Sequence, residues 1–472
     1  MSILLPQREE ITESTQKLIA ESKTKVGISF YSTIWRWHFY AGIFFAPIIA
    51  LLAISGSLYL FKPQIEGALY KELYRVEQVG ERSYSLSELA ARAAVAYPGL
   101  QIKALTLPSD ASSTVKLTGT FNSKAVSVYL DPYSAKVHGM LFTDEQLMSV
   151  VKKLHSQFVV GGTFANRLVE LAACWMIILL ITGIYMWWPR NKVSVWGTLL
   201  PRLRGGKRLF WRDLHAVPAF WLSAVLLLII LGGLPWSSVM GNQIDKLANA
   251  THTGSPPYGS TFGPKPSSPL PLTKDVAEDV PWAAESIPVP YSTAARSVPI
   301  SLEDVQAIAA QRQIPSPYTI TMPQGELGVY SLSLSAPNPS RNATLHIDQY
   351  TGHVMTDVRF SDYGLTAKLI SYGIAFHEGR LFGLANQLIG FAACLGLLLI
   401  LFSAYAMWRK RKPQGKLGAP AKPRDPKTVR TVALIMLVLG VIMPLVGVSI
   451  MFVFLLDKLL LSRVKALQTW FA

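Results

Sequence analysis

The stretch Trp35-Arg36-Trp37-His38 opens a long apolar segment, and Trp211-Arg212-Asp213-Leu214-His215 opens another. Each segment is followed by a polar region, then by a second histidine, in Leu154-His155 or in Phe376-His377, and then by a further apolar segment. The same order of features therefore occurs twice along the chain. An internal duplication of this kind predicts a fold with two equivalent halves.

The histidines of the two halves can be paired across the duplication. His38 corresponds to His215, and His155 corresponds to His377. The first two begin apolar segments and the last two precede apolar segments, so we expect one pair at each edge of a membrane. A neutral imidazole can bind a metal through its unprotonated nitrogen. The pattern therefore predicts two metal centres, each held by one histidine from each half.

The other four histidines have no counterparts at matching positions, and we expect them to be surface or sheet residues. They are His138, His252, His346 and His353.

Five segments are long and apolar enough to cross a membrane. Half of the 472 residues are apolar, and the mean hydropathy is +0.30. About 20 residues of helix cross the ~30 Å of hydrocarbon in a bilayer. The sequence thus predicts a membrane protein with an α-helical bundle, made of a duplicated four-helix core and a fifth transmembrane helix. The predicted spans are 37–61, 164–188, 217–240, 384–408 and 431–456.

The net charge of +16 is concentrated in two connections between predicted spans. Residues 189–216 carry seven Lys and Arg against one acid, and residues 409–430 carry nine against one acid. Short loops rich in Lys and Arg stay in the cytoplasm, where they face lipid head groups. The charge therefore indicates membrane topology, and we expect no nucleic-acid partner.

This charge pattern predicts the orientation of the chain. Residues 1–36 form a cytoplasmic tail, and an odd number of spans leaves the C-terminal tail, 457–472, outside. The two outer regions are 62–163 and 241–383. Lys458, Arg463 and Lys465 oppose this placement of the C-terminal tail.

Each outer region predicts a small α+β domain. Ser85-x-x-Glu88 and Ser301-x-x-Asp304 match the capping box that starts a helix, and three strand-like runs follow each helix. A helix packed on a three- or four-stranded antiparallel sheet is the expected fold. Residues 251–300, rich in proline, are expected to form an extended tether before the second domain. The predicted strands are 101–107, 113–121, 125–131, 316–323, 327–335 and 343–348.

Three short motifs give the chain a specific resemblance. They are the strand ending Asp348-Gln349-Tyr350-Thr351-Gly352, the stretch Gly233-Leu234-Pro235-Trp236-Ser237, and the helix exit Trp187-Trp188-Pro189-Arg190. Over roughly residues 35–410 the chain resembles the PepSY-associated transmembrane family, which includes the FoxB/PiuB-like iron-regulated siderophore reductases. The two outer domains would then be PepSY-like and periplasmic, and the protein would lie in a bacterial inner membrane.

The resemblance implies two haem b groups and the reduction of a ferric siderophore at the periplasmic face. His38 and His215 would bind the cytoplasmic-side haem, and His155 and His377 the periplasmic-side haem, about 20–30 Å away. The chain lacks a nucleotide-binding motif, so electrons would come from a cytoplasmic flavin reductase or from quinol. Haem propionates bind cations, and the candidate partners at the membrane edges are Arg36, Arg212, Arg167 and Arg380.

Two other functions fit parts of this pattern. The first is a permease for a siderophore or another ligand, although transporters more often show inverted repeats and buried midplane charges. The second is a periplasmic binding or regulatory protein built on the PepSY-like domains, with structural histidines and no redox activity. Replacement of His155 and His377 would abolish outer haem binding in the redox function, but would leave the regulatory function intact.

Overall fold

The computed structural model describes the backbone of most of the chain, and most side chains from Phe30 onward. Arg190 and much of the predicted tether lie outside the described residues. The described residues are 6–158, 160–189, 194–254, 271–292, 298–420, 426–461, 463–464 and 470.

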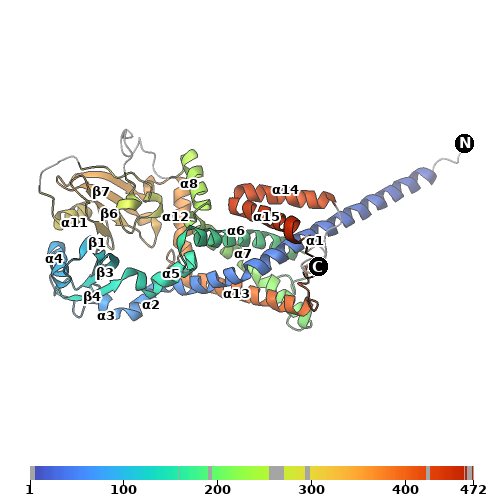
Figure 1. Ribbon diagram of the computed structural model, residues 1–472, viewed down its shortest axis with the longest axis horizontal. Helices are drawn as coiled ribbons and strands as arrows, with labels where there is room; N and C mark the ends of the chain where they lie inside the picture. Colours follow the sequence, from blue (N-terminus) through green and yellow to red (C-terminus); the bar gives the residue numbers. More distant parts are fainter. Residues whose placement is uncertain are drawn as a thin grey trace.

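Within these described ranges, four helices are long and apolar enough to cross a membrane, and they form a bundle at one end of the molecule (Figure 1). α1 packs against α6 and α13, and α7 packs against both of these helices. Phe45, Trp175, Leu226 and Ala393 lie in one buried core that all four helices share. The helices are α1 (Pro6–Tyr59), with its apolar part at Phe30–Tyr59, α6 (Gly162–Trp187), α7 (Lys207–Gly233) and α13 (Leu384–Arg411).

The segment predicted as a fifth span, 431–456, is two helices and not one. α14 (Pro426–Ile442) ends before Met443, and α15 (Pro444–Leu456) turns back along it, with Gly440 and Gly447 in backbone contact (Figure 1). Pro444 has no N–H to continue the first helix, and its ring clashes with the preceding turn.

The C-terminal region returns to the end of the bundle from which this hairpin starts. The Leu417 N–H, in the predicted loop 409–430, donates a hydrogen bond to the Trp470 carbonyl at 2.8 Å. The prediction of a single crossing that carries the C-terminal tail to the opposite side is therefore wrong.

The two outer regions form one antiparallel sheet of eight strands, in the order β4-β3-β2-β1-β5-β6-β7-β8. Each half contributes four strands, and the first strand of each half pairs with the other, with Leu105 opposite Ile320. The prediction of two separate sheets is therefore wrong, although the α+β content of each half is confirmed. The strands are β1 (Gln101–Thr106), β2 (Val115–Phe121), β3 (Lys124–Leu130), β4 (Val137–Phe142), β5 (Thr319–Thr321), β6 (Val329–Leu334), β7 (Ala343–Asp348) and β8 (Val354–Arg359).

One face of the sheet is covered by α4 (Leu86–Ala96) and α11 (Leu302–Gln311), which start at the two predicted capping boxes. In each box the serine side chain accepts from the backbone N–H three residues later, and the acid accepts from the serine N–H. The Glu303 carboxylate also accepts bonds from the N–H and hydroxyl of Ser87, which joins the two helices. The residues beneath them form one core that both halves share.

Two helices connect the sheet to the bundle and carry the outer histidines. α5 (Leu147–Gln157) packs against α1, and α12 (Leu365–His377) packs against α7. The remaining described helices are α2 (Lys62–Leu69), α3 (Lys71–Tyr74), α8 (Met240–Ala250) and α10 (Thr273–Val276), and the short helical turns are Thr143–Glu145, Leu234–Trp236, Trp282–Ala284, Pro339–Arg341, Phe360–Asp362 and Asp457–Leu461.

The turn after α7 is held by a buried carboxylate from α6. Glu170 is 2% exposed, and it accepts bonds from the N–H groups of Val239 at 2.9 Å and Met240 at 2.8 Å. These N–H groups begin α8 and have no partner within the helix. The carboxylate therefore caps α8 and fixes the exit of the chain after the Gly233–Ser237 stretch.

His346 is buried in β7, and it should make the outer sheet sensitive to acid. Its Nε2 bonds Thr273 at 3.1 Å and its Nδ1 bonds Ser331 at 2.9 Å, while burial lowers its pKa from 6.5 to about 4. The unfolded chain therefore binds this proton at a higher pH than the folded chain does. We expect the sheet to lose about 3 kcal/mol of stability as the pH falls from 6.5 to 4.

Circular dichroism melts of the wild type and of His346→Gln between pH 4 and pH 7 measure this effect. The wild type should lose stability more steeply than the variant across the window. Parallel pH curves for the two proteins would contradict the assignment.

Candidate functional site: two histidine pairs

The structure brings His38 and His215 together at one end of the four-helix bundle. Their ring centres are 6.5 Å apart, with the ring planes at 89°. His38 lies on α1 and His215 on α7, so each half of the chain supplies one ring. Both residues lie within long helices and not at helix starts, because α1 and α7 begin several residues before the predicted spans.

His155 and His377 form a second pair at the end of the bundle that faces the sheet. Their ring centres are 6.1 Å apart, with the ring planes at 58°. His155 comes from α5 and His377 from the last position of α12. The pairing across the duplication is thus present at both ends.

Both separations suit two imidazoles that bind one metal. A metal–nitrogen bond of about 2.0 Å on each side, with each nitrogen about 1.1 Å from its ring centre, places the two centres about 6 Å apart. Among the described residues, no group of three or more His, Cys, Asp or Glu could hold a metal ion. Two protein ligands are too few for a bare ion but suffice for a metal that brings its own planar ligand, as haem iron does.

At His38 and His215, the inner pair, the hydrogen bonds of the rings leave Nε2 of each ring available to bind a metal. His215 Nδ1 lies 3.0 Å from the Ile400 carbonyl, which can only accept, so Nδ1 carries the proton. His38 Nδ1 lies 2.8 Å from the Thr182 hydroxyl, which already donates to the Ile178 carbonyl at 2.7 Å. That hydroxyl must therefore accept from His38 as well. In each ring the lone pair remains on Nε2.

At His155 and His377, the outer pair, each Nδ1 is likewise engaged in a hydrogen bond. His377 Nδ1 lies 2.7 Å from the Ile229 carbonyl, and His155 Nδ1 lies 3.0 Å from the Ser55 hydroxyl. Ser55 in turn donates to the Leu51 carbonyl at 2.7 Å. Burial lowers the pKa of His155 to about 4, so its ring is neutral at physiological pH. All four Nε2 atoms are thus free to bind a metal.

Glycines give three of the rings their space. A Cβ built on Gly233 would lie 2.9 Å from His377 Cε1, one on Gly56 would lie 3.2 Å from His155 Cε1, and one on Gly183 would lie 3.4 Å from His38 Cε1. A Cβ at Gly42, one turn after His38, would meet no atom within 4 Å. His377 and His155 are therefore packed tightly against glycine backbone, and the His38/His215 pair has open space beside α1, which fits a flat macrocycle.

Three of the four candidate arginines bond to protein groups. Arg212 donates to Asp213 at 2.6 Å, Arg380 donates to Glu378 at 2.5 Å, and Arg36 donates to Tyr40 at 2.9 Å. Arg36 also donates to the Pro420 carbonyl, and Arg380 to the Ala336 carbonyl. Arg167 is exposed near the start of α6. The structure thus gives Arg36, Arg212 and Arg380 roles in holding loops, and their role toward propionates stays a prediction.

The other four histidines do not form pairs of this kind in the described part of the chain. His346 uses both ring nitrogens for hydrogen bonds, as described above. His138 Nδ1 lies 2.7 Å from the Glu72 carbonyl, and its Nε2 is buried without a hydrogen-bond partner. His252 and His353 lie in turns. The prediction that these four histidines are surface or sheet residues is confirmed, because His138 and His346 lie in strands and His252 and His353 are exposed.

The partners of the Nδ1 atoms are the functional residues that the sequence pattern did not reveal. Ser55 and Thr182 are isolated hydroxyls in apolar helices, and such residues are usually satisfied within their own helix. Both do bond their own helix, and both also accept from a histidine of another helix. Their polarity within apolar helices was the only indication in the sequence. Which histidine ring each hydroxyl bonds depends on how the helices pack.

Thr182→Val is expected to weaken metal binding at the inner pair. Valine keeps the shape of threonine but leaves the His38 Nδ1–H buried without an acceptor. Loss of such a bond, which orients a histidine for metal binding, typically costs 10–100-fold in affinity. Titration of the purified protein with haem measures this loss, and Thr182→Ser, which keeps the hydroxyl, is the matched control. Equal affinities in the two variants would contradict the assigned proton position.

The comparison with known families agrees with this architecture. The family model described as "PepSY-associated TM region" matches residues 35–411, a range that contains both histidine pairs and the whole sheet. No curated protein matches the chain. Since the matched range covers most of the sequence, the chain belongs to the PepSY-associated transmembrane family.

Proposed function

We propose that this protein is a di-haem b oxidoreductase of the bacterial inner membrane, which delivers electrons to a ferric siderophore at the periplasmic face. The main support for this proposal is the presence of two histidine pairs, one at each end of the bundle, with all four Nε2 atoms free. His38 and His215 would hold one haem, and His155 and His377 the other. When bound, these haems would supply one-electron redox chemistry at two points across the membrane.

The role of the chain is to fix and shield the two sites. The acceptors of the four Nδ1 protons hold the rings in one orientation and one tautomer. They are Thr182, Ile400, Ser55 and Ile229. Seventeen residues of helix separate His38 from Ser55, which contacts His155, so the pairs lie about 25 Å apart along α1. Two haems at this spacing would replace one long electron transfer across the membrane by shorter transfers.

The distribution of charge supports a proposed orientation, and the partners are proposed with it. The basic connections would face the cytoplasm, where a flavin reductase could supply electrons to the His38/His215 end, and membrane quinol is the other possible donor class. The sheet would lie in the periplasm and meet the ferric siderophore. Reduction would release iron because Fe(II) binds hard oxygen donors far less tightly than Fe(III) does.

A visible spectrum of the purified full-length protein, before and after dithionite, tests the proposal. We expect a Soret band, sharp α and β bands on reduction, and two haems per chain in a pyridine haemochrome assay. Ferrous protein should then be reoxidised when a ferric chelate is added without oxygen. A chain that takes up no haem during expression with haem precursor would overturn the proposal.

A further inference from the structure

The described part of the proline-rich region, residues 271–292, lies across the outer sheet, and we call it the strap. The Ser333 hydroxyl of β6 donates to the Glu278 carbonyl, and the Glu278 N–H donates to the Thr321 hydroxyl of β5 at 3.1 Å. Leu332 points into the core beneath α4 and α11, so the neighbouring Ser333 points to the opposite face of the sheet. The strap therefore covers the face that α4 and α11 leave open.

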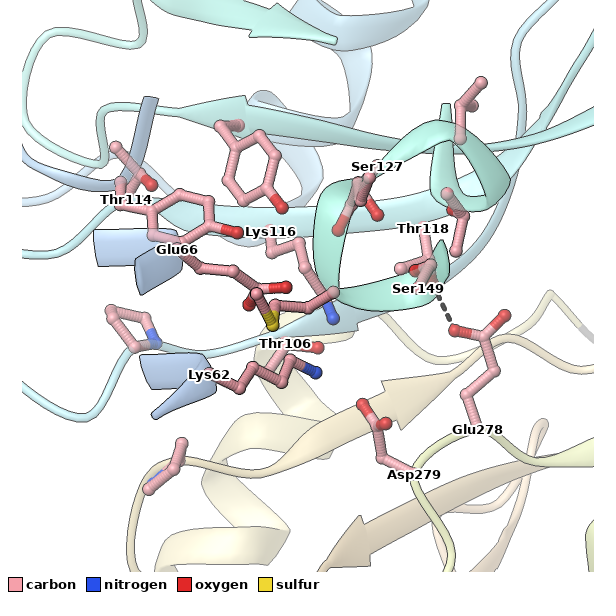
Figure 2. A pocket seen from close by; sticks show the side chains of 18 of the residues that line it. Lys62, Glu66, Thr106, Thr114, Lys116, Thr118, Ser127, Ser149, Glu278 and Asp279 are labelled. Carbon is pink, nitrogen blue, oxygen red and sulfur yellow. Dashed lines mark hydrogen bonds between the residues drawn. The ribbon is translucent and has the colours of Figure 1, made fainter. Parts of the chain in front are cut away.

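The tip of the strap borders a polar cavity of about 650 Å³ between the sheet and the helices α1, α2 and α5 (Figure 2). Glu278 accepts a bond from the Thr118 hydroxyl of β2, which Figure 2 draws as a dashed line. Asp279 accepts a bond from the Thr319 hydroxyl of β5 at 3.1 Å. Among the described residues, the cavity lining has three ammonium groups against three carboxylates, namely Lys62, Lys116 and Lys152 against Glu66, Glu278 and Asp279. The strap thus supplies two of the three carboxylates.

The sheet surface beneath the strap is built of polar side chains. The hydroxyls on this face, each at most 4% exposed, are those of Thr321, Ser331, Ser333, Thr344 and Thr356. The side chains that point from the same strands toward α4 and α11 are apolar, such as Leu332 and Leu345. A strand face rich in hydroxyls is typical of a surface that meets water, whereas a permanently covered face is usually apolar. The composition of the face beneath the strap thus suits a surface that is covered only part of the time.

Two buried hydroxyls beneath the strap have no hydrogen-bond partner in the described part of the chain. One is the hydroxyl of Thr344. Thr344 lies between Ser333, which bonds the strap, and Val358, which packs against it. The other is the hydroxyl of Tyr363, which shares an apolar cluster with Ile287 of the strap. Water would reach both hydroxyls if the strap lifted, so the cost of burying them falls only on the covered form.

A buried histidine links the strap to protonation. His346 Nε2 bonds the Thr273 hydroxyl of the strap at 3.1 Å. The strands on either side of His346 face it with Ser331 and Thr356, which carry no charge. Burial alone lowers the pKa of His346 to about 4, so a lifted strap would let the ring take up a proton near its ordinary pKa of 6.5. The charged residues on the elements packed against it, none of which shifts this pKa, are Lys274, Asp275, Glu278, Asp279, Glu285 and Asp348. Acid therefore favours the lifted form.

We propose that the strap is a movable lid, which is closed on the sheet in this structure and lifts to let solutes enter the cavity. Lifting would withdraw Glu278 and Asp279 and leave the three ammonium groups facing Glu66 alone. It would also bring the hydroxyls of Thr344 and Tyr363 into water. The lid controls access to the cavity, and this role is independent of whether the histidine pairs hold haem.

Hydrogen–deuterium exchange of the full-length protein in nanodiscs measures the opening of the strap. Thr344→Val keeps the shape of the side chain and removes the unpaired hydroxyl, so it should stabilise the closed form. We expect it to slow the exchange of amides in residues 271–292 about tenfold. Thr120→Val is the matched control, because Thr120 is a half-buried residue of β2 whose hydroxyl bonds Gln101, and it should leave strap exchange unchanged.

The same measurement tests the effect of acid. A fall in pH from 7 to 5 should speed strap exchange about 20-fold beyond the change in the intrinsic exchange rate, because the lifted form gains the His346 proton. His346→Gln should lose this extra acceleration, and the amides of β3 should show none in either protein. Equal acceleration of the strap in the wild type and in His346→Gln would overturn the coupling to acid.

Access to the cavity is measured separately with a thiol on its wall. Ser127→Cys changes a residue of β3 that lines the cavity, and a membrane-impermeant thiol reagent should label it at a rate that Thr344→Val slows by the same factor as strap exchange. The wild type, whose Cys174 and Cys394 lie within membrane helices, gives the background. Equal strap exchange in Thr344→Val and Thr120→Val, or labelling that Thr344→Val leaves unchanged, would overturn the lid. The thermal melt of each variant confirms that it is folded.

Discussion

His155→Ala is expected to reduce the haem content from two groups per chain to one. The substitution removes one of the two rings at the sheet end of the bundle and leaves the pair near the basic connections unchanged. The remaining haem should be reduced by dithionite, but ferric chelate added at the sheet side should no longer reoxidise it at the wild-type rate. A pyridine haemochrome assay and anaerobic stopped-flow absorbance measure the two effects.

Two further variants make this result specific. His353→Ala changes an exposed histidine of the same outer region and should keep both haems. The double variant His38→Ala/His155→Ala should lose the spectrum of a haem with two imidazole ligands at both sites, because each pair would keep a single ring. Two haems in His155→Ala with the reduced spectrum of the wild type would show that the sheet-end pair is not a ligand set, because a haem held by His377 alone would have a different spectrum.

Asp213→Ala is expected to lower the free energy of unfolding by about 3 kcal/mol. Asp213 is fully buried, and it accepts bonds from the backbone and guanidinium of Arg202 and from the guanidinium of Arg212. These bonds hold the connection after α6 against α7, two residues before His215. The expected loss is at the lower end for a broken buried pair, because the side chains of Arg202 and Arg212 are 34% and 50% exposed and regain water.

Equilibrium unfolding in mixed detergent measures the effect of Asp213→Ala. Asp144→Ala removes an ion pair with Lys153 whose carboxylate is 75% exposed, and it should change stability by less than about 1 kcal/mol. An equal loss in the two variants would contradict a special role for the buried carboxylate.

Local features of the fold could be predicted because they depend on neighbouring residues. The capping boxes at Ser85 and Ser301 involve atoms three residues apart, and the strands follow period-two alternation. The histidine pairs could be predicted because duplication relates the two halves by symmetry. These features need no knowledge of how distant segments pack.

Features that depend on distant contacts could not be predicted in this way. The joining of two sheets requires that β1 and β5 both present free edges of matching register, such as Leu105 against Ile320. The hairpin at Met443–Pro444 shows that an apolar run long enough to span can also fold back on itself. The acceptors of the histidine Nδ1 protons come from other helices, so their identity depends on the packing of the bundle.

The division of each histidine pair between the two halves has an evolutionary consequence. A precursor with a single copy would hold only half of each ligand set, and could complete both sets only as a homodimer about a twofold axis. The β1–β5 junction lies where such a dimer would join its two sheet edges, first strand to first strand. Gene fusion would then have made this association permanent and freed the two halves to diverge, as the unequal lengths of the outer regions show.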